Sequence, residues 1–250
     1  MYQEELFTAR RWRKHRVAVP LFCAFSVVLL LTGCQGTGAS TPPAATSQAP
    51  EPVRHVVVVG DSLSTGLGTS AKDAWPSLIN DSPLAKSMNV EISNESQNSS
   101  GFLSVGSKNS TFTTQTEEGV TPDTSMVLFF GSENDRGQDL QKLESAVVKT
   151  LAIAKQKASN VKLVMVGPPA YISTPEPNRL AVRDALKSAA RNAAVEFVDP
   201  IAEGWIFNDV DRLVGPDGVH PSVEGQQDLQ EKMGGLIASA LGARNTDLGG

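Results

Sequence analysis

Cysteine is nearly absent from this chain of 250 residues: its two cysteines, Cys23 and Cys34, both lie close to the N-terminus. Everything after Cys34 therefore has no disulfide and no thiolate metal site to stabilise it. The fold must rest on its hydrophobic core, and the stretch from Val53 to Leu241 is long enough to form one.

Clusters of basic residues are missing after residue 16. The chain has 22 Lys and Arg against 27 Asp and Glu, a net charge of −5 at pH 7. The segment 10–16 is strongly basic, so the part that follows is more acidic than the whole. An acidic domain without a basic patch binds the phosphate backbone of nucleic acids poorly, and we expect no nucleic-acid partner.

The longest apolar run, Val17–Leu31, is shorter than the roughly 20 residues that a membrane span requires. With the basic residues before it, it is typical of a signal peptide. The run leads into Leu31-Thr32-Gly33-Cys34, which resembles a bacterial lipobox with Cys34 as the lipidated residue. An ordinary secretory signal and an uncleaved anchor are the alternatives, and Arg10-Arg11 leaves twin-arginine export open.

These patterns divide the chain into four parts. Residues 1–33 are predicted to be a lipoprotein signal peptide, and residues 34–52, rich in small residues and proline, a flexible tether. Residues 53–241 are the predicted domain, and residues 242–250 a frayed tail. The expected location is therefore extracytoplasmic, on the cell membrane through a lipid at Cys34.

Short apolar runs alternate with helical patterns along the domain, which predicts an α/β fold with a parallel sheet covered by helices on both faces. The predicted strands are 56–59, 90–93, 126–130, 161–166 and 195–198. Helices are predicted from near Trp75, around 140–154, around 182–193 and around 229–240, with Ser222 as N-cap of the last. The Ser/Thr/Asn/Gly-rich segment Asn94–Thr124 has the composition of a long loop, either functional or disordered, whose first part is expected to face the site.

Ser62 follows directly after the valine run 56–59, at the end of a predicted buried strand. An ordinary turn would explain a Gly-Asp-Ser sequence equally well. A nucleophilic serine needs a base, and histidine is the usual one. Of the three histidines, His15 lies in the predicted signal peptide and His55 at the opposite end of the strand, which leaves His220.

Asp217 precedes His220 by three residues, between prolines that exclude a continuous helix. Within one turn a carboxylate at this spacing can reach a ring nitrogen of the imidazole and orient it. A surface turn whose polar side chains cap the next helix is the alternative. The presence of Ser62 favours the catalytic interpretation.

The domain resembles the SGNH (GDSL-type) serine hydrolases over essentially its whole length, here as a lipid-anchored bacterial member. Three sequence blocks in the family's order carry the resemblance: Gly60-Asp61-Ser62-Leu63-Ser64, Gly131-Ser132-Glu133-Asn134-Asp135 and Asp217-Gly218-Val219-His220-Pro221. It implies a flavodoxin-like three-layer α/β/α fold. It also implies ester hydrolysis without metal or other cofactor, with Ser62 as nucleophile, His220 as base and Asp217 as its orienting acid.

The resemblance further implies that the Ser62 N–H, the Gly101 N–H and the Asn134 side chain hold the oxyanion. Two departures from the family pattern affect these assignments. The third block has two residues between Gly131 and Asn134 where the family has one. In the second block Gly101 is the glycine at hand, but counting from Asn94 places the family's glycine nearer Ser99.

The sequence thus predicts an extracytoplasmic serine ester hydrolase acting through an acyl-enzyme on Ser62. Its substrate would be a small or lipidic ester, a thioester, or an acyl group on an envelope glycan. An acyltransferase on the same scaffold and a catalytically silent binding lipoprotein are the alternatives.

Overall fold

A computed structural model of the chain describes residues 52–131 and 133–242. Its five strands form one parallel sheet in the order β2-β1-β3-β4-β5. The strands are β1 (Arg54–Gly60), β2 (Val90–Asn94), β3 (Thr124–Phe130), β4 (Lys162–Val166) and β5 (Glu196–Val198). All five predicted strands are present, and the predicted parallel α/β fold with the flavodoxin-like strand order is confirmed.

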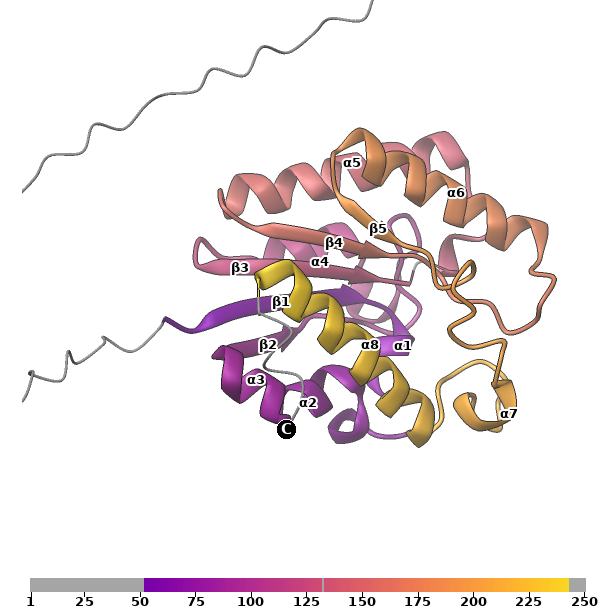
Figure 1. Cartoon of the computed structure of the whole chain (residues 1–250). Coiled ribbons are helices and arrows are strands. Elements are labelled where there is room, and N and C mark those ends of the chain that lie inside the picture. The colour runs from indigo at the N-terminus through magenta and orange to yellow at the C-terminus, as the bar shows by residue number, and fades with distance from the viewer. Residues whose placement is uncertain (1–51, 132, 243–250) are drawn as a thin grey trace, which may run out of the picture. The chain divides into compact units, whose positions relative to one another are not determined.

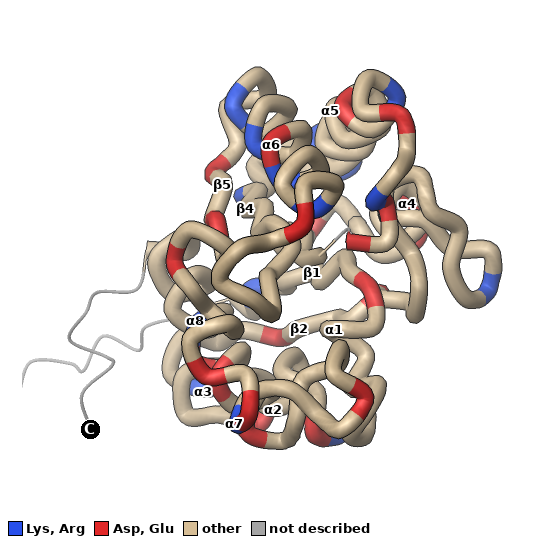
Figure 2. Tube along the Cα trace, turned by 90° about the vertical axis from the view of Figure 1, so that its right-hand side faces the viewer, with Lys and Arg blue, Asp and Glu red and all other residues tan. Residues whose placement is uncertain are grey.

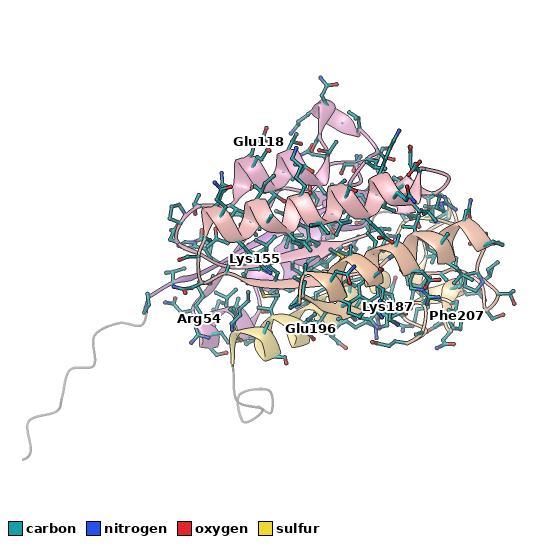
Figure 3. All side chains as sticks on the ribbon, turned by 90° about the horizontal axis from the view of Figure 1, so that it is seen from above. Arg54, Glu118, Lys155, Lys187, Glu196 and Phe207 are labelled. Carbon is teal, nitrogen blue, oxygen red and sulfur yellow. The ribbon has the colours of Figure 1, made fainter. Side chains whose placement is uncertain are left out.

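Helices cover both faces of this sheet, which makes three layers (Figure 1). One face packs against α4 (Phe112–Gly119), α5 (Leu140–Lys157) and α6 (Pro177–Asn192), and α5 and α6 lie side by side (Figure 3). The other face packs against α2 (Trp75–Asn80), α3 (Pro83–Met88) and α8 (Val223–Leu241). The remaining elements are the short helices α1 (Ser62–Thr65) and α7 (Val210–Leu213) and the 3₁₀ turns Ala71–Asp73, Ser107–Asn109 and Glu133–Asp135.

The valine run of β1 serves both layers. Val56 and Val58 belong to the core under α2 and α8, whereas Val57 and Val59 belong to the core under α4, α5 and α6. All four are almost completely buried. A central parallel strand needs apolar residues on both faces, and this explains why the run is continuous rather than alternating.

The segment 94–124 differs from its prediction as a long loop, because it contains α4. Thr111 and Thr114 form a reciprocal capping box at its N-terminus. Threonine has low helix propensity, which is why the composition suggested a loop. Burial of Phe112 stabilises the helix despite that propensity.

The last helix begins as predicted: the Ser222 hydroxyl accepts a hydrogen bond from the Gly225 N–H. No helix among residues 52–131 and 133–242 is both long and apolar enough to span a membrane. Cys34, the predicted signal peptide, the predicted tether up to residue 51 and the predicted tail from residue 243 lie outside the described residues.

Candidate active site

Ser62 lies where the fold predicts a site, directly after β1. In a sheet of this order, β1 and β3 are the neighbours from which the chain proceeds in opposite directions, and ligands bind at their carboxyl ends. Figure 2 looks onto that edge of the sheet, with α1 at the end of β1. Asp61 caps α1 by accepting from the Leu63 N–H at 3.0 Å, and so holds Ser62 at the first turn.

His220 reaches Ser62 from the far end of the chain. Its Nε2 lies 3.0 Å from Ser62 Oγ, and its Nδ1 lies 2.7 Å from Asp217 Oδ2. The predicted serine, histidine and aspartate are therefore joined by one continuous chain of hydrogen bonds. His55 instead lies at the opposite end of β1, between the carboxylates of Glu91 and Asp123.

The turn that carries His220 is held by hydrogen bonds within the turn itself, from the Asp217 side chain and from the backbone. Asp217 Oδ1 accepts from the N–H groups of Val219 and His220 at 3.0 and 2.9 Å. At the base of the turn, the Gly215 N–H donates to the His220 carbonyl at 2.7 Å. Asp217 is thus placed to orient the imidazole as the i, i+3 spacing predicts.

Electrostatics assign the tautomer of His220. The hydrogen bond from His220, reinforced by the two backbone N–H groups, lowers the pKa of Asp217 to about 2. An ionised carboxylate only accepts, so the proton between the two groups lies on Nδ1, and the other nitrogen, Nε2, faces Ser62. Such a ring can take the proton of the Ser62 hydroxyl.

Asn134 lies in the 3₁₀ turn after β3, with its side-chain amide directed to the second block. Nδ2 donates to the Ser100 carbonyl at 2.9 Å and makes a longer contact of 3.3 Å to Asp61 Oδ2. The extra residue of the third block has therefore not turned Asn134 away from the nucleophile, since Asp61 immediately precedes Ser62.

Gly101 does not have the free N–H that an oxyanion donor needs, because that group donates to the Ser104 carbonyl at 2.9 Å. This corrects the assignment that the resemblance suggested. A Cβ at Gly101 would come within 2.6 Å of the Asp135 carboxylate. Asp135 is fully buried and accepts from the N–H groups of residues 102, 103 and 104. The glycine therefore lets the loop close around Asp135.

Ser99, which lies nearest the family's glycine position when counted from Asn94, has a backbone conformation that favours glycine. Its φ is +63°, in the left-handed region that favours glycine. Among the described residues, no hydrogen bond to another group occupies its N–H or that of Ser62. These two amides, rather than that of Gly101, are available beside the nucleophile.

The inserted Glu133 forms a buried polar cluster that the sequence patterns did not predict. Arg179 of α6 donates to Glu133 Oε2 at 2.6 Å and to the Pro169 carbonyl at 2.7 Å. The Tyr171 hydroxyl lies 3.4 Å from the same carboxylate oxygen, and the guanidinium carbon lies 5.0 Å from the Tyr171 ring centre. Burial, together with the charge of Glu133, raises the pKa of Tyr171 well above 10, so the phenol stays protonated. The extra residue beside Asn134 was the available signal, but its partner on α6 is visible only in the folded chain.

Fold and site together define the class of the SGNH/GDSL-type carboxylic ester hydrolases, and the comparisons with known proteins agree. The model of the GDSL-like Lipase/Acylhydrolase family matches residues 58–227. The chain is 33% identical to GDSL lipase Rv0518 of Mycobacterium tuberculosis over 191 residues, covering 74% of this chain and 82% of that protein. It therefore belongs to the GDSL-like lipase/acylhydrolase family.

Solved structures share the fold at low sequence identity. The psychrotrophic esterase EstA from a Pseudoalteromonas species matches with a TM-score of 0.58 and 18% identity, covering 74% of this chain and 97% of that one. The acetyl xylan esterase AlAXEase matches with a TM-score of 0.59 and 15% identity, covering 73% and 99%. Both likenesses support the three-layer α/β/α architecture.

Proposed function

We propose that the protein hydrolyses carboxylic esters through an acyl-enzyme on Ser62. The observation that carries the proposal is the unbroken chain from Ser62 Oγ through His220 to Asp217, with distances of 3.0 and 2.7 Å. In this mechanism Ser62 Oγ attacks the ester carbonyl as His220 Nε2 takes its proton. The imidazolium, stabilised by Asp217, then protonates the departing alcohol.

Hydrolysis of the acyl-enzyme repeats these steps with water as the nucleophile. His220 takes a proton from water, the hydroxide attacks the acyl carbon, and the proton returns to Ser62 Oγ as the carboxylic acid leaves. In both halves the carbonyl oxygen becomes negative. We assign its stabilisation to the N–H groups of Ser62 and Ser99 and to the Asn134 amide, whose 3.3 Å contact with Asp61 is the weaker of its two bonds.

A p-nitrophenyl ester tests the proposal directly. Wild type should release nitrophenol, and a fluorophosphonate should label it at Ser62 alone. Ser62→Ala should remove both turnover and labelling. Labelling elsewhere, or undiminished turnover in that variant, contradicts the mechanism; a folded wild type without turnover or labelling supports the silent binding lipoprotein instead.

We propose small acyl esters or acylated envelope glycans as substrates. Two structural neighbours support glycans by their names, the acetyl xylan esterase and a family 2 carbohydrate esterase with a carbohydrate-binding domain. Hydrolysis rates against esters of increasing acyl length, with and without added glycan, test this choice. Acyl groups recovered on the glycan rather than in water identify the acyltransferase alternative.

We further propose that the protein acts outside the cytoplasm, anchored to the cell membrane by lipid on Cys34. The support is the lipobox-like Leu31-Thr32-Gly33-Cys34 after a basic and apolar leader. Labelled fatty acid should enter the wild type and be absent from Cys34→Ala. Equal labelling of the two proteins contradicts the anchor.

A further inference from the structure

Gln115, on the helix that the sequence did not predict, reaches from α4 to the end of the nucleophile strand. It is 2% exposed. Its Oε1 accepts from the Gly60 N–H at 2.9 Å, and its Nε2 donates to the Gly60 carbonyl at 3.1 Å and to Ser100 Oγ at 2.9 Å. A buried amide is costly unless it is satisfied, and this one binds with both its oxygen and its nitrogen.

On its β2 side, the Gly60 peptide lies beyond the end of strand pairing. Pairing with β2 ends at Val58, although β3 still pairs with Gly60 on the other side. Beyond β2, the Gln97 N–H lies 3.2 Å from the Gly60 carbonyl. The Gln115 amide binds both the N–H and the carbonyl of Gly60, as a neighbouring strand would. Ser62 follows two residues later, so this contact fixes the backbone from which the nucleophile and its N–H project.

Ser100 links Gln115 to the other proposed oxyanion donors. Its Oγ lies 2.9 Å from the Gly60 carbonyl and 2.6 Å from the Gln97 carbonyl while it accepts from Gln115. The Ser100 carbonyl accepts from Asn134 Nδ2 at 2.9 Å, and the preceding residue is Ser99. One glutamine thus connects to all three groups assigned to the oxyanion.

We propose that Gln115 is a positioning residue that holds the Ser62, Ser99 and Asn134 donors in a common geometry for the transition state. The inference rests on the proposed function, because it presupposes an oxyanion. Preorganised donors act only when they already point to the developing charge, and displacement of about 1 Å can cost about 10²-fold in rate. A residue that only filled the core would affect stability and leave this geometry unchanged.

Gln115→Met is the first test, since methionine has nearly the same volume and removes every hydrogen bond. We expect kcat on a p-nitrophenyl ester to fall by about 10- to 100-fold, with KM changed less than about twofold. Thr116→Val is the matched control. Thr116 is the next residue of α4, equally buried, and its hydroxyl donates to the Phe112 carbonyl of its own helix. This control should keep wild-type kcat whatever its thermal stability.

Gln115→Glu adds a pH signature. A carboxyl group at this place can donate to Ser100 or Gly60 only while it is protonated, and burial favours the protonated form. We therefore expect kcat of this variant to decrease as pH rises, relative to wild type at each pH. Gln115→Met has no titrating group at this position, so the ratio of its kcat to that of wild type should be the same at every pH.

The outcomes separate the two proposals. If wild type hydrolyses the ester and Ser62→Ala does not, but Gln115→Met keeps wild-type kcat, the positioning role is wrong and the function stands. A Gln115→Glu ratio that does not depend on pH also contradicts it. Should Gln115→Met fail to fold, Ser100→Ala removes a single hydroxyl of the same network, and unchanged kcat there overturns the proposal. A wild type without hydrolysis contradicts the proposed function itself.

Discussion

Two regions meet at Ser62 and differ in their contact with water. One is the proposed acid–base turn, residues 215–222, and the other is the proposed oxyanion side of the site, centred on Ser100, Asn134 and Gln115. The Asp217 side chain is 48% exposed and that of His220 18%. On the oxyanion side, Asp61 and Asp135 are fully buried and Gln115 almost so. The turn is stabilised by hydrogen bonds within itself, two of them to the Asp217 carboxylate, whereas the oxyanion side is part of the hydrophobic core and its buried polar networks.

This difference indicates which substitutions should change the catalytic rate without changing the stability of the fold. A side chain of the turn can be removed with little effect on the core, so its loss should appear in the rate alone. On the oxyanion side the same residues satisfy buried groups, so rate and stability should change together. Four predictions test this contrast.

The largest effect is expected for His220→Ala. Loss of the base should lower kcat by about 10⁴-fold or more, because no other described histidine reaches Ser62. The free energy of unfolding, from urea titration, should change by less than about 1 kcal/mol. Val219→Ala in the same turn is the control and should retain activity. Loss of folding in His220→Ala would contradict the independence of the turn.

Arg179→Met should mainly lower the stability of the fold, whereas His220→Ala should mainly lower the rate. It removes the cation that lies 2.6 Å from the buried Glu133 carboxylate and leaves the longer 3.9 Å pair with the more exposed Arg136. Breaking a buried pair costs about 3–5 kcal/mol, and Arg136 should offset part of this loss. Urea unfolding measures the loss. The double variant Arg179→Met/Glu133→Gln removes the buried charge as well and should regain part of it. A single variant as stable as wild type would show that this cluster is not coupled to the core.

Asn134→Ala should lower kcat by about 10²–10³-fold, equivalent to roughly 3–4 kcal/mol, with KM little changed. The variant deletes the side-chain donor outright. Ser99→Ala is its counterpart: the backbone N–H of Ser99 remains, so steady-state kinetics should show only a mild effect. If Asn134→Ala loses less than about tenfold, Asn134 is not an oxyanion donor.

The smallest effect concerns Asp217 and pH. Its folded-state pKa of about 2 lies below the ordinary 3.8, so the carboxylate stabilises the fold above about pH 4, and this contribution is lost as pH falls toward 2. Because the side chain is nearly half exposed, the contribution should be about 0–1 kcal/mol. Unfolding free energies of wild type and Asp217→Asn should converge between about pH 4 and pH 2. A larger difference in unfolding free energy, or one that increases as pH falls, would show that Asp217 behaves like the buried residues of the oxyanion side.

The same contrast explains what the sequence could predict. The Ser62, Asp217 and His220 positions depend on local features, a buried strand that ends and a short turn, and local features are visible in sequence. Three of the five strands follow from continuous apolar runs for the same reason, and the other two, 90–93 and 195–198, from shorter runs interrupted by a glutamate. Helix α4 was missed because its threonines have low helix propensity, and Gln115 was missed with it.

Gly101 shows the limit most directly. The resemblance to the family suggested its N–H as a backbone donor, but that N–H donates to the Ser104 carbonyl, and the missing Cβ makes room for Asp135. Asp135 is 34 residues away in sequence, and its contact with the loop follows from tertiary packing. The positive φ of Ser99 is likewise a property of the folded loop.

The hydrogen bond between Ser62 and His220 joins residues 158 positions apart. Bringing such distant residues together costs loop-closure entropy, and we expect this contact to form late in folding. The sheet and most helices can therefore be in place before the last turn docks and the nucleophile meets its base. During refolding from denaturant, hydrolysis should recover after the helical circular-dichroism signal. The recovery of esterase activity would then report the rate of the final step of folding.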